Sequence, residues 1–427
     1  MASSPRTQHY HLMKHNMNPL QKNVEFVPGE HWIYYAPDTR FVFGESEINE
    51  VVSVLRNGWL GTSGVTQEFE KSIATLFGKK YGLFVNSGSS ANLLALEALN
   101  LPKGSEIITP ACTFNTTVAP IVQRGFVPVF VDTEHDTYQM DARRLEDALS
   151  KNTKAVLAPH LIGNFVELER IRDFCKRHKL IFVEDSCDTL GGLYHGKPSG
   201  EWSDISTTSF YASHLITAGG AGGMLMTNDK DILERARVFA NWGRGINGYF
   251  DPIQNRLAAY EVDGKPYDSA FAFIEAGYNF KPTEMQAAFG LAQLKRLPSF
   301  ARARKKNFDR LSKFFKQYEQ WFILPEPRND SEVNWLALPL TIRADAPFKR
   351  NDLVTFLEQH KIQTRPVFSG NITKQHAYKD VRYRAIGKLP NSQLILHNGL
   401  LVALHHTLTP PLLDYIEKMF KEFLSNK

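Results

Sequence analysis

Cysteine is scarce in this sequence. Only three occur among 427 residues, Cys112, Cys175 and Cys187, and no two of them form a Cys-x-x-Cys pair. Disulfide frameworks and zinc sites depend on paired or clustered cysteines, so neither is favoured here. We predict a protein without a metal centre.

Long hydrophobic runs and a strong excess of charge are also lacking. The first 26 residues are polar, with no apolar stretch of signal-peptide length, and no later segment approaches the length of a membrane span. Fifty basic residues against 45 acidic ones leave a formal charge of +5, too mild in so long a chain to indicate nucleic-acid binding. We expect a cytoplasmic protein that binds neither membranes nor nucleic acids.

What the sequence does contain is a regular alternation of strand-like and helical stretches. The helical ones include residues 68–77, where Phe69, Ile73, Leu76 and Phe77 share one face. Such alternation predicts a doubly wound α/β fold with a mostly parallel sheet. The seven expected strands are residues 81–86, 106–111, 128–132, 155–160, 181–184, 205–211 and 223–227.

The pattern changes towards the C-terminus. Residues 283–310 predict a long helix, and mixed strand and helix follow, ending in an amphipathic helix through Leu412, Ile416, Met419 and Phe423. We predict a tail or arm over residues 1–40, in which the aromatic run from His31 to Tyr35 anchors the end. A large domain over 41–300 and a smaller α+β domain over 301–427 complete the expected organisation.

Polar residues follow several of the predicted strands. The turn at residues 86–92 contains Gly88, Ser89 and Ser90 and opens an apolar helix, so its N–H groups and the helix dipole suit a phosphate. By itself such a turn is also common as an ordinary loop with an N-cap serine. Asp185 ends another strand, where a lone aspartate is usually a cap. Both lie where open α/β sheets bind ligands.

The segment from Ile181 to Asp229 carries the most specific pattern. A strand ends in Asp185, Asp188 and a Gly-Gly pair follow, a second strand leads to His214, and a glycine-rich turn at residues 219–223 precedes another strand. This pattern resembles the sugar aminotransferase and dehydratase (DegT/DnrJ/EryC1/StrS) family of fold type I, aspartate aminotransferase-like pyridoxal phosphate (PLP) enzymes. In that family, the residue at the position of His214 is normally the lysine that binds the cofactor covalently.

The resemblance implies roles for further residues. Asp185 would pair with the pyridine nitrogen, Phe114 would stack on the ring, Asp188 would lie near the ring, and Asn279 would reach the phosphate of a partner subunit, which implies a homodimer. Phe114 is equally plausible as a core residue. The residues implied at the phosphate are Gly88, Ser89, Ser90 and Ser209. Candidate sugar or diphosphate contacts are Asn164, Arg244, Arg365 and Asn371, for each of which an ordinary surface role is at least as plausible.

Histidine at position 214 implies a change of chemistry. Imidazole has no primary amine, so the cofactor must be held noncovalently. The resemblance is to the histidine-containing branch of 3-dehydratases, which use pyridoxamine phosphate on 4-keto-6-deoxy nucleotide sugars. His214 would be the base at the cofactor's C4′ carbon, and L-glutamate would regenerate the amine. Two positions depart from the family pattern: Asp188 replaces Glu or Gln, and Ala221 replaces an acidic residue.

Three other functions remain open at this stage. A reductase-coupled 3-dehydrase of the ascarylose type carries a [2Fe-2S] cluster, which needs four thiolates. Cys187 resembles one of them, but the region after Trp242, including residues 245–250, holds no thiol, so we expect no cluster. An ordinary nucleotide-sugar aminotransferase is disfavoured by His214. A noncatalytic nucleotide-sugar sensor would not need Asp185, Phe114, Ser209 and Asn279.

Overall fold

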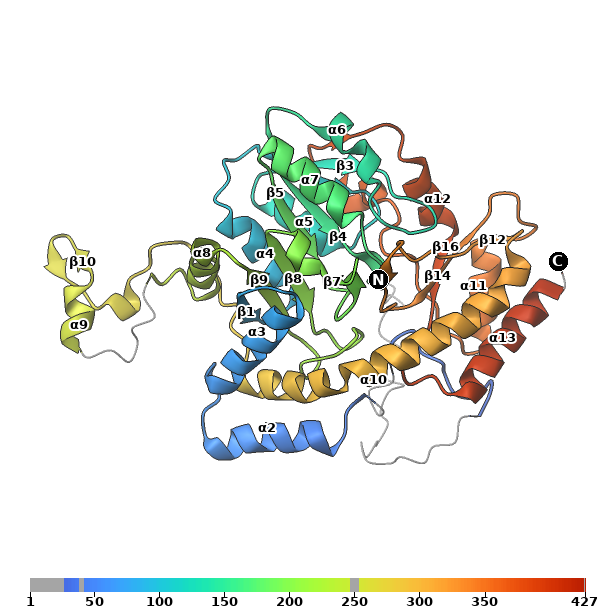
Figure 1. The fold of residues 1–427 in the computed structure, drawn as a ribbon, viewed down its shortest axis with the longest axis horizontal. Coiled ribbons are helices and arrows are strands. Elements are labelled where there is room, and N and C mark those ends of the chain that lie inside the picture. The colour runs from blue at the N-terminus through green and yellow to red at the C-terminus, as the bar shows by residue number, and fades with distance from the viewer. Residues whose placement is uncertain (1–26, 38–41, 246–252, 426) are drawn as a thin grey trace, which may run out of the picture.

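A sheet of eight strands forms the centre of the protein (Figure 1). The computed structural model describes residues 27–37, 42–245, 253–425 and 427. The strand order is β1-β9-β8-β5-β4-β2-β3-β15, with all seven predicted strands present and a two-residue eighth strand at the edge. The bounds are β1 Tyr81–Val85, β2 Glu106–Pro110, β3 Val127–Val131, β4 Thr153–Pro159, β5 Ile181–Asp185, β8 Ile205–Ser209, β9 Gly223–Thr227 and β15 Arg384–Ala385.

The sheet is mostly parallel, as predicted. From β8 to β15 every neighbouring pair runs parallel, and only β9 lies antiparallel to its neighbours β1 and β8. Successive residues of one strand enter different apolar clusters: Val183 packs with α4 (Gly88–Ala98) and α8 (Lys230–Ala240), whereas Phe182 packs with α7 (Leu168–His178). Since side chains alternate across a strand, both faces of the sheet are covered.

The long helix predicted at residues 283–310 is α10, Glu284–Phe315. A capping box sets its start: the Thr283 hydroxyl accepts from the Gln286 N–H, and the Gln286 side chain accepts from the Thr283 N–H. At one end the helix packs against α2 (Glu45–Asn57) and α3 (Gly64–Leu76), and at the other against α13 (Pro410–Ser425). It therefore connects the central sheet to the C-terminal elements. The proposed domain boundary at residue 300 falls inside it.

The C-terminal elements build a smaller layer around an antiparallel sheet of three strands, β12-β14-β16. These strands are β12 Phe322–Ile323, β14 Leu338–Ile342 and β16 Gly399–Val402, and the helices beside them are α11 Arg350–Gln359, α12 Pro390–Asn398 and α13. In Figure 1 this orange and red layer lies at the opposite side of the central sheet from β1. Its apolar core joins Phe315, Leu340, Ile395 and Phe420.

The described part of the predicted N-terminal tail is attached to this layer. The Ile33 N–H donates to the Lys361 carbonyl at 2.8 Å, and the Gln363 N–H returns a bond to the Ile33 carbonyl at 2.9 Å. The Tyr35 N–H donates to the Gln363 side chain at 3.0 Å. The aromatic run thus anchors the segment, as expected. Residues 1–26 and 38–41 of the predicted tail lie outside the described residues.

An arm projects from the other side of the molecule, drawn in yellow in Figure 1. It contains α9 (Ile253–Ala258) and the short hairpin of β10 (Glu261–Val262) and β11 (Lys265–Pro266). Large apolar side chains are exposed along it and at its base: Trp242, Ile253, Leu257, Val262, Tyr267, Phe271, Phe273 and Ile274.

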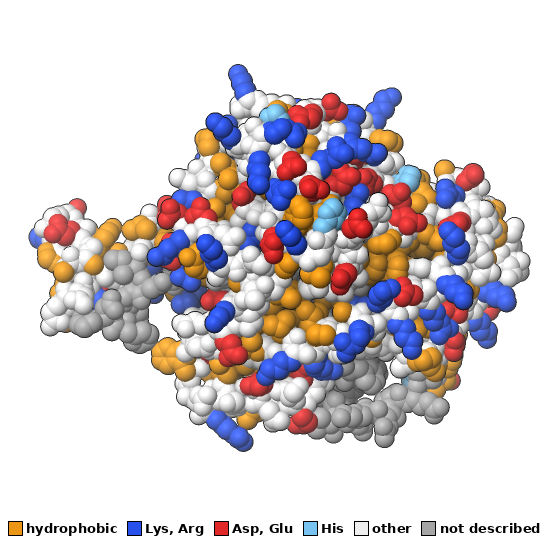
Figure 2. All heavy atoms as spheres, in the orientation of Figure 1, with side chains coloured by type: hydrophobic (Ala, Val, Ile, Leu, Met, Phe, Trp, Pro, Cys, Tyr) orange, Lys and Arg blue, Asp and Glu red, His pale blue; other side chains and the backbone are white. Residues whose placement is uncertain are grey.

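The body of the protein has a mixed surface. Figure 2 shows basic and acidic side chains interspersed over the visible face, as a nearly balanced composition predicts. Within the described ranges, none of the helices combines the length and the apolar character that a membrane span requires.

The start of β9 generates a prediction about stability. A Cβ atom added to Gly223 would lie 2.2 Å from the carbonyl carbon and oxygen of Ser87. Gly223→Ala should therefore displace the turn before α4 and lower the free energy of unfolding by ~1–3 kcal/mol. Gly64→Ala, at a helical position with nothing within 4 Å, is the matched control. Thermal denaturation of both variants checks this, and a Gly223→Ala protein as stable as the control would contradict it.

Candidate active site

A large cavity opens at the carboxyl ends of the parallel strands. Its volume is about 1070 Å³, and side chains that follow β1, β2, β4, β5 and β8 line it. The C-terminal layer closes another side with Gln363, Arg365 and Phe368, and Tyr35 contributes from the N-terminal segment. Ligands of open α/β sheets bind at this edge. Of the predicted site residues, Gly88, Ser89, Phe114, Asp185, Asp188, Ser209, His214 and Arg365 line the cavity.

One corner of the cavity is built for an anion. Ser87 caps α4 in an extended conformation, and its hydroxyl accepts from the Ser90 N–H at 3.1 Å. A side chain on Gly88 would meet the Cβ of Ser209 at 2.6 Å, so only glycine lets the helix start this close to β8. The remaining N–H groups of the first turn and the Ser209 hydroxyl then suit a phosphate.

Ser90 takes a different place from the one predicted. Its hydroxyl donates to the Asn86 side chain at 2.7 Å and lies 2.9 Å from the Ser87 hydroxyl. It is buried and does not line the cavity. The structure therefore corrects its role from a phosphate contact to a residue that holds the turn.

Asp185 is fixed by three hydrogen bonds. One carboxylate oxygen accepts from the Asn92 amide at 2.7 Å and the Thr117 hydroxyl at 2.8 Å, and the other accepts from the Cys187 N–H at 3.2 Å. Asn92 is oriented in turn by the Thr207 hydroxyl, which donates to its carbonyl oxygen. The carboxylate is 5% exposed and begins no helix, so it is not a helix cap. Its carboxylate is therefore held in a fixed orientation in the cavity wall.

His214 follows β8, and its side chain is 16% exposed. Its Nδ1 lies 3.4 Å from the Ser209 carbonyl oxygen. Because a carbonyl only accepts, this contact places the proton on Nδ1 and leaves Nε2 unprotonated. Burial lowers the pKa of His214 to about 4, and Arg304 lowers it too, against the Ser209 carbonyl and Asp185. The imidazole is thus neutral at pH 7, as a general base requires.

Asp188 lies across from this histidine. One carboxylate oxygen accepts from the Ile162 N–H at 3.0 Å, and the other lies 3.9 Å from His214 Nε2. Ile162 has a φ of +63°, which is unusual for a β-branched residue and aims its N–H at the site. Burial, together with the charge of Asp185, raises the pKa of Asp188 to about 7 against the Ile162 hydrogen bond, which lowers it. Asp188 is therefore partly protonated near neutral pH.

Phe114 and Arg365 present exposed groups to the cavity. The Phe114 side chain is 54% exposed and meets Phe368 edge to face with ring centroids 6.2 Å apart, so it is not a core residue. Arg365 is exposed, and it uses one guanidinium nitrogen on the Thr364 carbonyl at 2.8 Å. A flat ring and a cation in this wall suit an aromatic cofactor and an anionic substrate.

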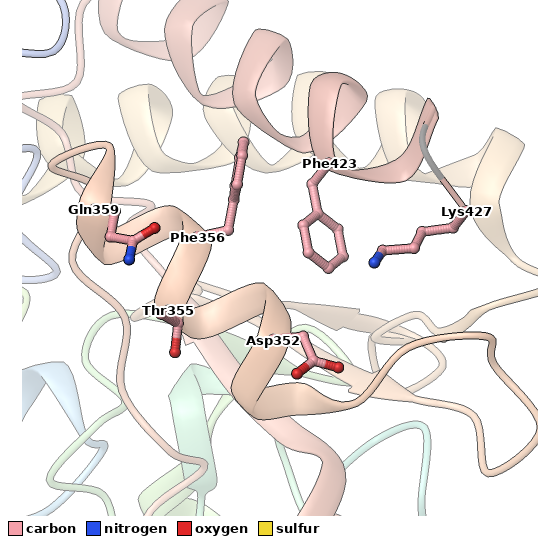
Figure 3. Close-up of a pocket in the computed structure, with 6 residues that line it drawn as sticks. All are labelled: Asp352, Thr355, Phe356, Gln359, Phe423 and Lys427. Atoms are coloured by element: carbon pink, nitrogen blue, oxygen red, sulfur yellow. The ribbon is translucent and has the colours of Figure 1, made fainter.

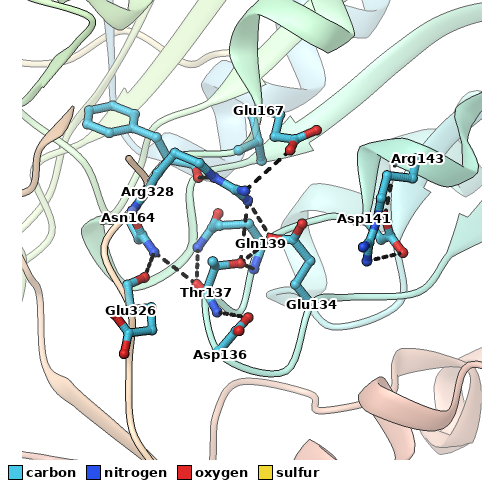
Figure 4. A network of polar contacts seen from close by, with 12 residues as sticks. Glu134, Asp136, Thr137, Gln139, Asp141, Arg143, Asn164, Glu167, Glu326 and Arg328 are labelled. Atoms are coloured by element: carbon cyan, nitrogen blue, oxygen red, sulfur yellow. Dashed lines mark hydrogen bonds and ion pairs between the residues drawn. The ribbon is translucent and has the colours of Figure 1, made fainter. Parts of the chain in front are cut away.

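Asn164 is not available to a substrate. Its amide nitrogen donates to the carbonyls of Thr137 and Glu326, and its oxygen accepts from the N–H groups of Phe165 and Arg328. Figure 4 shows it inside this polar network. The side chain is fully buried and has used its bonding capacity, so the predicted sugar contact is corrected to a structural role.

Asn371 is likewise structural. Its side-chain oxygen accepts from the Thr373 N–H and hydroxyl, and its amide faces the Gln393 side chain at 3.3 Å. It caps the short helix Ile372–Lys374 and is buried outside the cavity wall. The predicted substrate contact is therefore not found for this residue.

Arg244 and Asn279 lie apart from the cavity of their own chain, at the base of the arm. The Arg244 guanidinium is 4.8 Å from the Trp242 ring and 5.2 Å from the Phe271 ring. Asn279 is exposed and pairs through its backbone with Asn241. Any role of either residue at an active site requires another subunit.

Several residues of the site were missed by sequence reasoning. Asn92, Thr117 and Thr207 hold Asp185 but come from separate elements. His160 lines the cavity with its Nε2 2.9 Å from buried Glu184. Tyr35 belongs to the aromatic run that predicted only an anchor. The aromatic character of this run was the only sequence signal for Tyr35, because aromatic residues near a terminus need a packing partner.

A second, smaller hollow of about 400 Å³ lies between α11 and α13 (Figure 3). The side chains that line it are Asp352, Thr355, Phe356, Gln359, Phe423 and Lys427. The Lys427 ammonium lies 4.8 Å from the centre of the Phe423 ring. It includes none of the predicted site residues, so the large cavity is the candidate active site.

The comparisons with known proteins agree on one family. The profile of the DegT/DnrJ/EryC1/StrS aminotransferase family matches residues 42–421. The chain is 35% identical to the lipopolysaccharide biosynthesis protein RfbH of Salmonella typhimurium (strain LT2), over 99% of this chain and 98% of that protein. It is 37% identical to the dTDP-4-dehydro-2,6-dideoxy-D-glucose 3-dehydratase of Saccharopolyspora spinosa, over 86% of this chain and 81% of that protein.

Solved structures of a third relative confirm the predicted fold. The E. coli GDP-4-keto-6-deoxy-D-mannose 3-dehydratase with bound hydrated PLP is 29% identical, with a TM-score of 0.82 over 91% of this chain and 99% of that chain. A further structure of such a dehydratase holds a trapped PLP-glutamate geminal diamine, with 29% identity and a TM-score of 0.80 over 90% of this chain and 99% of that chain.

The cavity of this chain fits the same cofactor. The anion corner at the start of α4 suits its phosphate, Asp185 provides a fixed carboxylate for the pyridine nitrogen, and the exposed ring of Phe114 provides a stacking surface. Where a covalent site would offer a lysine, the wall offers His214.

Proposed function

The chain belongs to the DegT/DnrJ/EryC1/StrS aminotransferase family, and we propose that within it the protein is a PLP-dependent 3-dehydratase of a 4-keto-6-deoxy nucleotide sugar. The observation that carries the proposal is a neutral, cavity-facing His214 in a site that otherwise fits the cofactor. A histidine can move a proton but cannot bind the cofactor covalently. That combination favours removal of a hydroxyl over transfer of an amine.

The relatives support this choice. Proteins named as 3-dehydratases stand at 37% and 31% identity, over 86% and 88% of this chain. The names of these two relatives differ in nucleotide, dTDP in one and GDP in the other, so the proposal specifies the class of sugar and leaves the nucleotide open.

Each residue has a part in the proposed mechanism. The cofactor, as pyridoxamine phosphate, supplies an amine for the keto group and a ring that accepts and returns electrons. With the cofactor bound, the α4 turn and Ser209 would hold its phosphate, Asp185 would orient the pyridine nitrogen, and Phe114 would offer a surface for the ring to stack on. His214 accepts the C4′ proton at Nε2, the nitrogen left unprotonated by the Ser209 contact. Arg365 offers its guanidinium to an anionic group of the substrate.

L-glutamate is the proposed amino donor that restores the pyridoxamine form. The trapped PLP-glutamate species in a related dehydratase supports this assignment. Asp188 and Ala221, the two positions that depart from the family pattern, both line the cavity. In the proposed half-reaction with glutamate, an aspartate lies beside His214 at the position where the family pattern has Glu or Gln.

A homodimer is the proposed assembly. The exposed apolar side chains of the arm form a surface that association with a second copy would bury. Asn279 and Arg244 lie at the base of this arm, outside the cavity of their own chain. In the proposed dimer they complete the site of the other subunit, Asn279 at its phosphate.

The main test concerns His214. His214→Asn keeps a polar side chain and leaves Asp185 and the phosphate corner intact, so cofactor should bind almost normally while dehydration falls by at least ~10²-fold. Mass spectrometry of 4-keto-6-deoxy sugar nucleotides incubated with glutamate and cofactor measures loss of the 3-hydroxyl, and gain of an amine would indicate an aminotransferase. Borohydride should trap cofactor on the protein only in His214→Lys.

The matched control is His195→Asn, the same change at an exposed histidine outside the cavity. It should dehydrate at the wild-type rate. A His214→Asn protein that also dehydrates at the wild-type rate would refute the assignment, and a protein that binds the sugar nucleotide without turning it over would favour the sensor.

The dimer generates a complementation test. Asn279→Ala should lower the cofactor affinity about tenfold, as loss of one hydrogen bond to a charged group predicts, and sedimentation should still show a dimer. At a cofactor concentration that fills the wild-type site but leaves the Asn279→Ala site mostly empty, mixed dimers of the Asn279→Ala and His214→Asn proteins should regain activity. One of their two sites then combines an intact His214 with an intact Asn279. If mixing restores no activity, Asn279 does not act across the interface.

Metal analysis addresses the cluster-dependent alternative. The sequence has three cysteines, and two of them, Cys112 and Cys175, are buried in separate apolar clusters. The purified protein should therefore contain no stoichiometric iron and show no cluster absorption, because such a cluster needs four thiolates. Elemental analysis and a visible spectrum measure this. One cluster per chain would replace the proposed mechanism with one that takes electrons from a reductase.

A further inference from the structure

We propose that Asp188 and His214 act as a proton-sharing pair, in which ionised Asp188 stabilises the imidazolium that forms when His214 takes its proton. The inference rests on the proposed function for the source of that proton. Under this inference, the ionisation of Asp188 sets the lowest pH at which dehydration runs.

The geometry leaves these two groups facing each other. His214 Nδ1 is occupied by the Ser209 carbonyl at 3.4 Å, and one oxygen of Asp188 is occupied by the Ile162 N–H at 3.0 Å. The remaining nitrogen and the remaining oxygen are 3.9 Å apart in the cavity wall. This distance is too long for a hydrogen bond, but it is within the range of an ion pair once the imidazole is protonated.

The proton balance follows from this arrangement. Before the reaction, Nε2 is unprotonated and Asp188 is ionised. When the proton arrives at Nε2, the pair consists of an imidazolium and a carboxylate, with no change in the charge of Asp188. If Asp188 is already protonated, the imidazolium forms without its counter-charge. Protonation of Asp188 therefore lowers the basicity of His214 without changing the imidazole itself.

The surroundings separate the two titrations. Burial raises the pKa of Asp188 to about 7 and lowers that of His214 to about 4. Above about pH 7, Asp188 is ionised and Nε2 of His214 is unprotonated, and this is the state of the pair that can take up the proton. The ionisable groups that act on the pair come from the N-terminal segment, the end of β5 and α10: Tyr35, Asp185, Cys187 and Arg304. Arg365, in the segment after α11, lines the same cavity.

The first experiment uses protein without cofactor and measures melting temperature against pH. Asp188 has a pKa raised above its ordinary value of 3.8, so the stability it contributes at low pH is lost as pH rises towards 7. Asp188→Asn keeps an acceptor for the Ile162 N–H, and it should melt higher than the wild type at pH 8 but not at pH 4. Asp173→Asn, at an exposed aspartate, should change neither value.

A double-mutant cycle tests whether the two groups are coupled. If they share a proton, the pH-dependent shift of the double variant Asp188→Asn, His214→Asn should differ from the sum of the single shifts. Additive shifts would overturn the inference, and they would do so without reference to catalysis.

The second experiment is the pH profile of dehydration by the loaded enzyme. The wild-type kcat should rise as pH passes about 7. Asp188→Asn should lower the plateau about tenfold or more and flatten the profile between pH 6 and 8, whereas Asp188→Glu should restore the acid limb. If Asp188→Asn keeps both the wild-type rate and the acid limb, the inference is wrong.

The two proposals fail in different ways. A fully active His214→Asn protein removes the proposed function. Loss of dehydration in His214→Asn, together with an unchanged pH profile in Asp188→Asn, leaves the proposed function standing and removes only the proton-sharing pair.

Discussion

The hydrogen-bonded carboxylate of Asp185 is the interaction on which the rest of the site depends. Its donors come from α4, from the first turns of α5 (Asn115–Gln123) and from the backbone just after β5, and Thr207 of β8 orients one of them. A buried carboxylate is costly unless such donors surround it. The anion corner, Phe114, Asp188 and His214 lie at or just beyond the ends of α4, α5, β5 and β8. Fixing Asp185 between these elements therefore also fixes the positions of the other groups.

Desolvation then assigns the protonation states. Asp188 and His214 lie close together, yet burial moves their pKa values in opposite directions, to about 7 and about 4. Arg304 of α10 contributes to this difference: it is fully buried, donates to the carbonyls of Trp335 and Leu336, and disfavours a positive charge on His214. Groups whose environments separate their titrations are suited to acid and base roles.

The sequence carried enough information for the fold and for the centre of the site. Apolar runs that end in polar residues located the strands, and the Thr283–Gln286 capping box marks the start of α10 within one residue of the predicted position. The family identification is confirmed. The errors concern asparagine and serine side chains, since Asn164, Asn371 and Ser90 all turn into the protein. Their partners lie far away in sequence or depend on a local rotamer, and neither can be derived from a pattern of residue types.

The exchange of lysine for histidine places a demand on packing. A covalent bond would hold the cofactor even in a loosely built pocket, but a noncovalent site must obtain its affinity from groups that are already in position. The glycines around the phosphate corner meet that demand. At Gly88 and Gly223 even a methyl group would overlap neighbouring atoms, at 2.6 Å and 2.2 Å, because α4, β8 and β9 approach so closely. The chain thus packs its anion corner tightly, while the imidazole of His214 forms no covalent bond to a cofactor, as its proposed role as a base requires.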